Sequence, residues 1–389
     1  MVSSNSHQTS LNTMEQPRIY FPNLNGLRFI AALLVIIHHV EAYKGFFRME
    51  HDDIPFATIA GPLGVILFFV LSGFLITYLL LFEETAFGKI NIRNFYTRRI
   101  LRIWPLYFLI LLLAFLVLPN IDIFVLPRFG KDAIYSQLAL KIIFYVFFLP
   151  NLACAALSSI PYASHTWSIG TEEQFYLVWP LLLRFFKKYR MAMMLGIILC
   201  YNIILALLKS PWSDDLPGSL VLRLFWPGFS IDCMAIGGIL ALLYFRKSRM
   251  LSLLMDNRVF YVVLMATIFL LAMGYHFPYL HDKIYAVLFG IIVLNLAAND
   301  TLSISLENNI LNYLGRISYG LYMYHPIAIV LAFAICRNTG HFSNWFIYPL
   351  AMVLTSAMAA LSYQYFESWF LKRKQQFTEI ISGKEKPVN

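Results

Sequence analysis

Residues 23–43 read NLNGLRFIAALLVIIHHVEAY, a run of about twenty mostly apolar residues, which is the length of helix that crosses a lipid bilayer. Arg28 and His39 stand eleven residues apart in this run. Eleven residues make about three helical turns, so both side chains share one face, roughly 16 Å apart along the axis. Arg28 would lie at the inner membrane surface and His39 near mid-bilayer, where ionisable groups are functional candidates by default. His38 points about 80° away and is the weaker candidate.

The composition of the whole chain is that of a membrane protein. Of its 389 residues, 59% are hydrophobic and only 13% are charged, whereas a soluble domain carries roughly 25% charged residues. The predicted fold is all-α, a polytopic membrane protein of about ten transmembrane helices in one bundle. The predicted spans are residues 26–44, 59–82, 103–118, 165–186, 191–209, 222–245, 259–275, 283–298, 310–335 and 346–371.

The basic residues orient the chain in the membrane. Short loops rich in Lys and Arg stay in the cytoplasm, and ten spans place every basic loop, and both termini, on that side. The basic residues of these cytoplasmic loops account for the net charge of +9. Because no basic stripe or binding motif accompanies it, we expect no nucleic-acid partner. The basic segments are residues 83–102, 184–190, 246–249 and 372–374.

Residues 137–150, QLALKIIFYVFFLP, decide the number of crossings. Apolar runs of 10–14 residues are more often interfacial or re-entrant than spanning, and a crossing here would put two basic segments outside. We therefore expect this run to stay on the outer side. The predicted organisation is a cytoplasmic tail at 1–22, a transmembrane domain at 23–371 and a cytoplasmic tail at 372–389.

Two arginines follow the second span, in the segment FYTRRILRIWPLYF at residues 95–108. Arg99 and Arg102 are three residues apart and share a helix face. Their guanidinium groups are suited to hold phosphates, so a cytoplasmic cofactor with phosphates and an adenine would fit there. Ordinary positive-inside anchoring of the helix is the alternative interpretation.

Two further segments carry polar groups that an apolar bundle does not need. In HTWSIGTEEQFYLVWPLLL, residues 165–183, the carboxylates of Glu172 and Glu173 either cap the interface or face the interior and orient a histidine. In LGRISYGLYMYHPIAIV, residues 314–330, Pro326 removes a helix hydrogen bond and frees the carbonyl of Tyr322. His325 precedes this proline, and the favoured interpretation is a packed, hydrogen-bonded histidine, with a functional role as the alternative.

Five motifs in this order make the chain similar to acyltransferase family 3, the integral membrane acyltransferases of the polysaccharide O-acetylase type. In that family an Arg or Lys precedes a first-span His by eleven positions, as Arg28 precedes His39. Its paired arginines correspond to Arg99 and Arg102. The motifs are NGLRFIAALLVIIHH at 25–39, GVILFFVLSGFLI at 64–76, FYTRRILRIWPLY at 95–107, HTWSIGTEEQFYLVWP at 165–180 and GRISYGLYMYHP at 315–326.

The resemblance implies transfer of an acyl group, mostly acetyl, from cytoplasmic acyl-coenzyme A to a sugar on the far side of a bacterial cytoplasmic (inner) membrane. Its tryptophan–glutamate segment corresponds to Trp167, Glu172 and Glu173. Two positions depart from the family pattern. Ile66 stands where many relatives have an acidic residue, and Asp232, in FSIDCMAIGG, lacks the arginine often found just before it.

The expected enzyme is an O-acyltransferase with the lipid bilayer, acyl-coenzyme A and a carbohydrate acceptor as its partners. His39 is the base or a transient acyl carrier, and Glu172 or Glu173 orients it. No permanent cofactor and no metal are expected, since the histidines lack metal-site spacing and the four cysteines are scattered. The alternative is a transporter or flippase with a His39–Glu172 proton relay. The donor-binding candidates are Arg28, Arg99 and Arg102, and the substrate or supporting candidates are Trp167, Asp232, Ser318, Tyr319, Tyr322 and His325.

Overall fold

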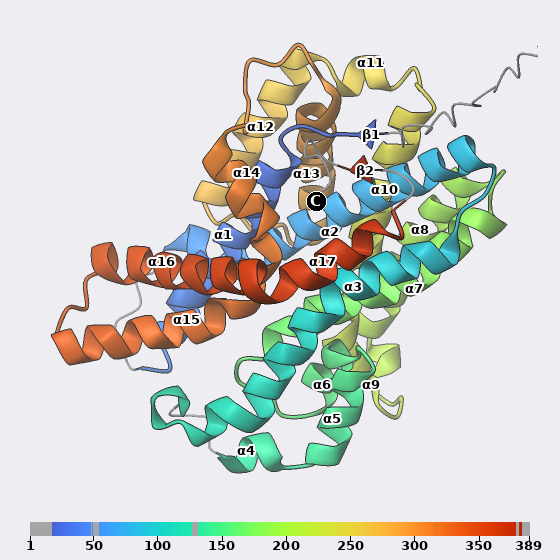
Figure 1. The fold of residues 1–389 in the computed structure, drawn as a ribbon. Helices are drawn as coiled ribbons and strands as arrows, with labels where there is room; N and C mark the ends of the chain where they lie inside the picture. Colours follow the sequence, from blue (N-terminus) through green and yellow to red (C-terminus); the bar gives the residue numbers. More distant parts are fainter. Residues whose placement is uncertain (1–17, 48, 50–53, 127–130, 379–380, 383–389) are drawn as a thin grey trace, which may run out of the picture.

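The computed structural model describes residues 18–47, 49, 54–126, 131–378 and 381–382. In these residues the chain is a bundle of helices (Figure 1), which confirms the predicted all-α membrane fold. The strands described are two short ones, β1 (Arg18–Ile19) and β2 (Ile381–Ser382), which pair in parallel.

Eight helical stretches among the described residues are long and apolar enough to cross a membrane, and each coincides with a predicted span. The other two predicted spans correspond to α7 (Trp167–Phe185) and α12 (Asn257–Ala272). Helix α7 carries three charged residues and α12 is only 16 residues long, so the count of ten stays a prediction. The eight are α1 (Leu24–Lys44), α2 (Pro55–Phe87), α3 (Ile92–Leu112) continued to Asn120, α8 (Arg190–Lys209), α9 (Ser219–Phe225) joined to α10 (Ile231–Phe245), α13 (His281–Ala298), α15 (Ser318–Thr339), and α16 (Asn344–Ser362) continued to Gln375.

The remaining elements are short and connect or extend these helices. Two are π-helical turns, at Leu113–Val117 and Tyr363–Glu367, and lie within long helices. The 3-10 turns are Leu118–Asn120, Asp122–Phe124, Ser164–Thr166, Pro211–Ser213 and Trp226–Gly228. The short helices are α4 (Lys131–Tyr135), α5 (Leu138–Val146), α6 (Pro150–Ala156), α11 (Leu251–Leu254), α14 (Asn309–Arg316) and α17 (Ser368–Gln375).

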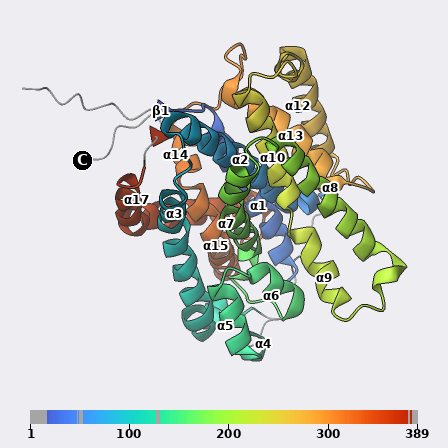
Figure 2. The same cartoon turned by 90° about the vertical axis from the view of Figure 1, so that its right-hand side faces the viewer.

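The segment 137–150 does not form a spanning helix. Helix α5 has nine residues, so it rises about 14 Å, well short of a hydrocarbon core of about 30 Å. The chain turns at Phe148, which has a positive φ of 57°, and Pro150 then begins α6. Helices α4 and α5 lie at the end of the molecule opposite β1 (Figure 2).

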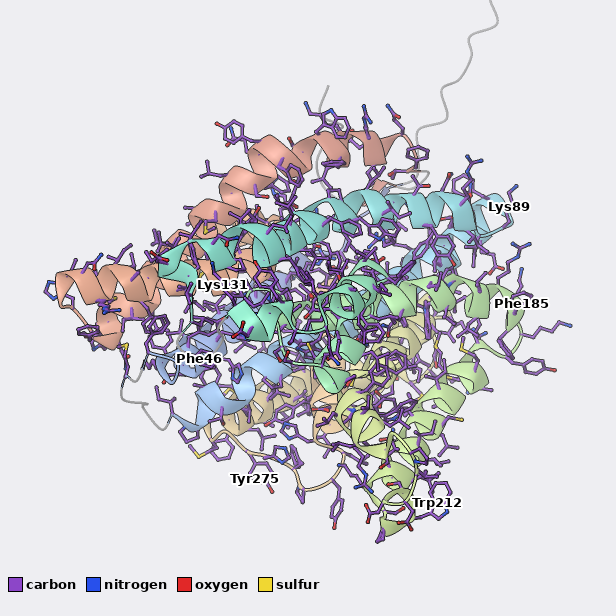
Figure 3. All side chains as sticks on the ribbon, turned by 90° about the horizontal axis from the view of Figure 1, so that it is seen from below. Phe46, Lys89, Lys131, Phe185, Trp212 and Tyr275 are labelled. Atoms are coloured by element: carbon purple, nitrogen blue, oxygen red, sulfur yellow. The ribbon has the colours of Figure 1, made fainter. Side chains whose placement is uncertain are left out.

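The two ends of the described chain lie together at one end of the bundle (Figure 1). Strands β1 and β2 pair there. In addition, Arg98 donates a hydrogen bond to the carbonyl of Phe377 at 2.9 Å and forms an ion pair with Glu83 at 3.0 Å. In Figure 3, Lys89 and Phe185, which lie in two predicted cytoplasmic loops, are at one end, away from Phe46 and Lys131.

Helix α2 forms the centre of the bundle, where it packs against α1 and α10. Its contact with α10 requires glycine on both sides. A Cβ atom on Gly73 would stand 1.9 Å from the carbonyl oxygen of Met234, and one on Gly237 would stand 2.2 Å from that of Val70. Close backbone contact of this kind is typical of membrane helices, which gain stability from packing small residues. It fixes the position of Ser72, next to Gly73, toward the interior.

Candidate active site

A cavity of about 1080 Å³ opens between α1, α2, α3, α7, α15 and α17, at the end of the bundle where the two chain ends meet. Glu172 is the carboxylate among the described residues that line it. Six cationic side chains line the same cavity, so the site carries a large excess of positive charge. They are Arg28, Arg99, Arg102, Arg316, Lys372 and Lys374. We call this cavity the arginine cavity.

The three arginines predicted to act together do converge on this cavity. Arg28, in the second turn of α1, donates to Asn25 Oδ1 at 3.2 Å. Arg99 packs over the ring of Tyr176 at 5.6 Å, and its buried Nε has no hydrogen-bond partner among the described residues. Arg102 donates to the carbonyl of Arg316 at 3.3 Å. Each guanidinium therefore keeps N–H donors that an anion in the cavity could use.

Three of the six cations were not among the sequence candidates. Arg316 ends α14, and Lys372 and Lys374 lie in α17, both beyond the boundary placed at residue 371. From the sequence, the KRK segment at 372–374 was interpreted only as a basic segment that orients the last span. Because α17 packs against α3, the segment expected as a free tail contributes instead to the cavity wall.

The two glutamates bind other groups than histidine. Glu172 accepts hydrogen bonds from Ser72 and Tyr176, each at 3.0 Å. Glu173 accepts one from Trp104 Nε1 at 3.0 Å. No hydrogen bond joins either carboxylate to His39 in the part of the chain that the structure describes, so the expected Glu–His contact is not formed. The reason is the position of Glu172 beside Ser72 of α2, in the wall of the arginine cavity.

His39 instead lies against a second histidine. The rings of His39 and His325 have centroids 4.7 Å apart. His39 Nδ1 is 2.9 Å from the carbonyl of Val35, and His325 Nδ1 is 2.6 Å from that of Tyr322. The second contact uses the carbonyl that Pro326 was predicted to free. Since a carbonyl oxygen only accepts, each Nδ1 carries the proton, and the neutral rings have their lone pair on Nε2.

A third ring completes this histidine cluster, which we define as His39, His165 and His325. The His165 ring lies 5.1 Å from that of His325 and comes from the 3-10 turn before α7. His165 was not among the residues predicted from the sequence, because a histidine at the start of a span has no distinctive spacing. The His38 ring lies 5.2 Å from that of His39 but faces α2: its Nδ1 is 2.8 Å from the carbonyl of Ala57, and its ring packs against Gly61.

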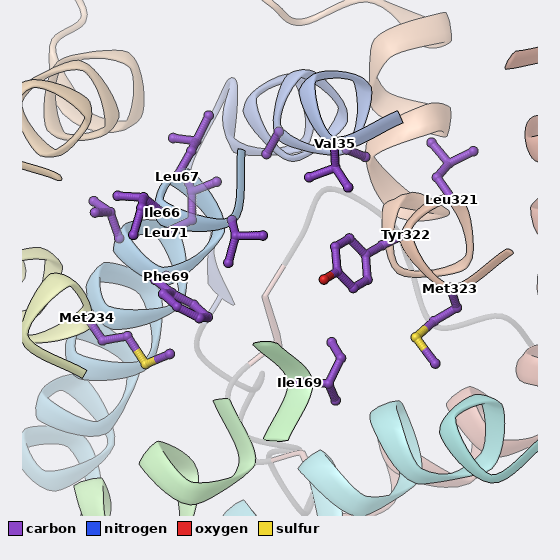
Figure 4. Close-up of a cluster of buried hydrophobic side chains, with 14 of the residues drawn as sticks. Val35, Ile66, Leu67, Phe69, Leu71, Ile169, Met234, Leu321, Tyr322 and Met323 are labelled. Carbon is purple, nitrogen blue, oxygen red and sulfur yellow. The ribbon is translucent and has the colours of Figure 1, made fainter. Parts of the chain in front are cut away.

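Tyr322 connects the cavity to the histidine cluster. It lines the cavity, and its ring lies 5.7 Å from that of His325 and 5.5 Å from that of His165. Its hydroxyl is 2.7 Å from the carbonyl of His165 and 2.6 Å from Ser168 Oγ. Figure 4 shows Tyr322 in an apolar surrounding that includes Val35 and Ile169. The residue therefore forms a wall shared by both sites.

The other predicted residues divide between the cavity and the packing around it. Ser318 and Tyr319 line the cavity, and the Tyr319 hydroxyl donates to the carbonyl of Ile103 at 2.8 Å. Trp167 packs edge-on against Phe69, with ring centroids 6.4 Å apart, and is not part of the cavity wall.

Asp232 lies in a different buried cluster. It is fully buried and forms an ion pair with Lys283 at 3.0 Å. The Lys283 ammonium also lies 4.3 Å from the centre of the Tyr201 ring. These residues come from α10, α13 and α8, and none of them lines the arginine cavity. The structure thus separates Asp232 from the other candidates.

The fold and site together define a polytopic membrane protein with a strongly basic cavity, and one residue of its wall, Tyr322, contacts buried imidazoles. The chain belongs to the acyltransferase domain family, whose sequence profile matches residues 21–363. The family resemblance inferred from the five motifs is therefore confirmed.

Several bacterial proteins are similar to this chain over most of its length. O-acetyltransferase OatA of Staphylococcus aureus (strain MRSA252) is 27% identical, over 95% of this chain and 62% of its own length. A Bacillus subtilis (strain 168) protein named "Putative peptidoglycan O-acetyltransferase YrhL" is 27% identical, over 90% of this chain and 54% of its own length. The chain thus spans between half and two thirds of the length of these relatives. No solved structure matches it.

Proposed function

We propose that this protein is a membrane O-acetyltransferase. It takes an acetyl group from acetyl-coenzyme A at the end of the bundle where its chain ends meet, and transfers the group to a carbohydrate hydroxyl at the opposite side of the membrane. The observation that supports this most directly is the union of the basic cavity and the histidine cluster through Tyr322. The names of the two relatives support acetyl as the group and a cell-wall carbohydrate such as peptidoglycan as the acceptor.

The cavity suits the phosphates of the donor. Six cations against one lining carboxylate leave an excess of positive charge that a free anion of several charges would neutralise. Arginine binds phosphate through paired N–H groups, and Arg28, Arg99 and Arg102 each face the cavity. In this proposal they hold the phosphates, while the thioester arm extends past Tyr322 toward His39.

The chemistry then requires a base for the acceptor hydroxyl. Nε2 of His39 takes the hydroxyl proton while the acceptor oxygen forms a bond to the acetyl carbon. The carbon–sulfur bond breaks, and its electron pair leaves with the sulfur of coenzyme A. Because Nδ1 of His39 is held by the Val35 carbonyl, the ring presents its basic nitrogen in a fixed direction.

Release of free coenzyme A from acetyl-coenzyme A tests this proposal. The purified protein in lipid nanodiscs should release coenzyme A and acetylate a peptidoglycan fragment, and a transporter would do neither. His39→Asn keeps a donor for the Val35 carbonyl but removes Nε2, so its turnover should fall by about 10²–10⁴-fold. His38→Asn is the matched control and should stay within a few-fold of the parent, because His38 packs against α2. Normal turnover in His39→Asn would refute the assignment of the base.

The direction of transfer can be tested separately. Single cysteines at Lys131 and Ala156, in a background without the native cysteines, should react with an impermeant thiol reagent added outside. A cysteine at Lys89 should react only after permeabilisation. Both expectations follow from the opposite positions of α4 and the α2–α3 turn (Figure 1). Labelling of positions 89 and 131 from the same side would contradict transfer across the membrane.

A further inference from the structure

His325 has a basic nitrogen that the protein leaves without a donor. The side chain is 0% exposed, and its Nδ1 proton is used by the Tyr322 carbonyl. Its Nε2 is buried and has no hydrogen-bond partner among the described residues. Buried polar atoms are nearly always paired, and each exception calls for an explanation. Simple packing does not require an imidazole here, because an apolar ring would fill the same space without an unpaired lone pair.

The neighbours of His325 indicate which group could donate a hydrogen bond to that nitrogen. The nearest ring is that of His39, at 4.7 Å, whose Nδ1 proton is also committed to a backbone carbonyl. In the neutral state both rings therefore have an acceptor nitrogen and no proton to share. One added proton on His39 supplies the missing donor. The pair is complete only when His39 has accepted a proton.

The surrounding titratable groups favour this arrangement. The ring of His165 lies 5.1 Å from that of His325, and both of its nitrogens are buried. The ring of His38 lies 5.2 Å from that of His39, and the rings of Tyr322 and Tyr43 complete the contacts. None of these ring contacts brings a carboxylate to the histidine cluster. A proton that arrives there is stabilised by imidazole nitrogens rather than by a carboxylate.

We propose that His325 is a positioning residue that shares, through Nε2, the proton that His39 removes from the acceptor. This inference rests on the proposed function. The acceptor oxygen bonds to the acetyl carbon, the carbon–sulfur bond breaks with its electron pair on sulfur, and the acceptor proton moves to His39. His325 Nε2 then accepts a hydrogen bond from that proton and spreads the charge over two rings. When the ester leaves, the proton passes to water, and the thiolate of coenzyme A takes a proton from water.

Amide substitutions separate this role from packing. In His325→Asn the side-chain amide can still donate to the Tyr322 carbonyl, but no basic nitrogen remains. We expect kcat for acetyl transfer to fall by about 100-fold, the lower end of the range for acid–base groups, with KM for acetyl-coenzyme A unchanged. A purely structural histidine would instead be replaced by asparagine with little loss of kcat. Wild-type kcat in His325→Asn would therefore overturn the proposal.

Chemical rescue provides the second readout. His325→Ala leaves a space the size of the lost ring, and added imidazole should restore at least a tenth of the wild-type kcat. Pyrrole has the same ring size without a basic nitrogen and should restore none. Equal rescue by both compounds would show that the ring only fills space and would overturn the proposal. Wild-type protein runs in parallel: if it releases no coenzyme A, the proposed function fails, and not the role of His325 within it.

Discussion

Two ionic clusters of this protein differ in the balance of their charges. In the cluster of Asp232 and Lys283, one carboxylate faces one ammonium at 3.0 Å, with the Tyr201 ring beside it. In the arginine cavity, six cations line the wall with Glu172. Charges removed from water must be paired or they cost stability. The first cluster meets this requirement within the protein, whereas the second meets it only with a bound anion or solvent.

This difference separates a stabilising role from a binding role. The balanced pair joins α10 to α13 and has no need of a ligand. The unbalanced cavity is suited to a ligand of opposite charge.

Breaking the balanced pair should destabilise the protein. Asp232→Asn leaves the Lys283 ammonium without its counter-charge in a buried site, at a cost of about 3–5 kcal/mol. Denaturation in a mild detergent would measure the loss. KM for acetyl-coenzyme A in the remaining folded protein should not change.

A double variant serves as the control for this prediction. Asp232→Leu combined with Lys283→Met replaces the pair by apolar groups and should recover most of the stability, because buried pairs are often replaced at little cost. If Asp232→Asn were fully stable but bound the donor poorly, Asp232 would belong to the donor site and the comparison would fail.

Removing one cation from the cavity should weaken donor binding. Charge-assisted hydrogen bonds contribute about 1.5–3 kcal/mol each, so Arg99→Ala or Arg102→Ala should raise the Kd for acetyl-coenzyme A by about 10-fold to 100-fold. Titration calorimetry would measure it. Arg93→Ala, an exposed position of the same helix, is the control and should bind normally. Unchanged affinity in both cavity variants would make these arginines topology anchors only.

Raising the salt concentration should affect the two clusters differently, with a smaller change than either substitution above. The cavity is open to solvent, and screening shortens the Debye length from about 10 Å at 0.1 M to about 3 Å at 1 M salt. KM for acetyl-coenzyme A should therefore rise by about two- to fivefold over that range. The stability contributed by the buried Asp232–Lys283 pair should change far less, as a comparison of wild type with the double variant would show. A KM that is independent of salt would contradict phosphate binding by exposed cations.

The sequence predicted the positions of the helices better than the contacts between them. Apolar length and basic loops were sufficient to place eight spans and to keep α5 from crossing, because both follow from bilayer thickness and charge. The freed carbonyl of Tyr322 was also predictable, since it depends only on the local effect of Pro326.

The tertiary contacts of the site could not be predicted in the same way. Which face of α7 meets α2 depends on packing of the whole bundle, and so Glu172 was expected at His39 but lies at Ser72. The approach of His165 to His325 depends on the turn before α7, which the apolar pattern does not reveal. The entry of Lys374 into the cavity depends on α17 folding onto α3.

The cavity has a consequence for biosynthesis. It takes Arg28 from the first long helix and Lys374 from the last, so the ribosome must add 346 residues after Arg28 to reach and include Lys374. At 5–20 residues per second this takes roughly 20–70 s. During that time the membrane holds a growing protein in which Arg28 already exists but the cavity that surrounds it does not. A prematurely terminated chain would therefore lack a wall of this cavity.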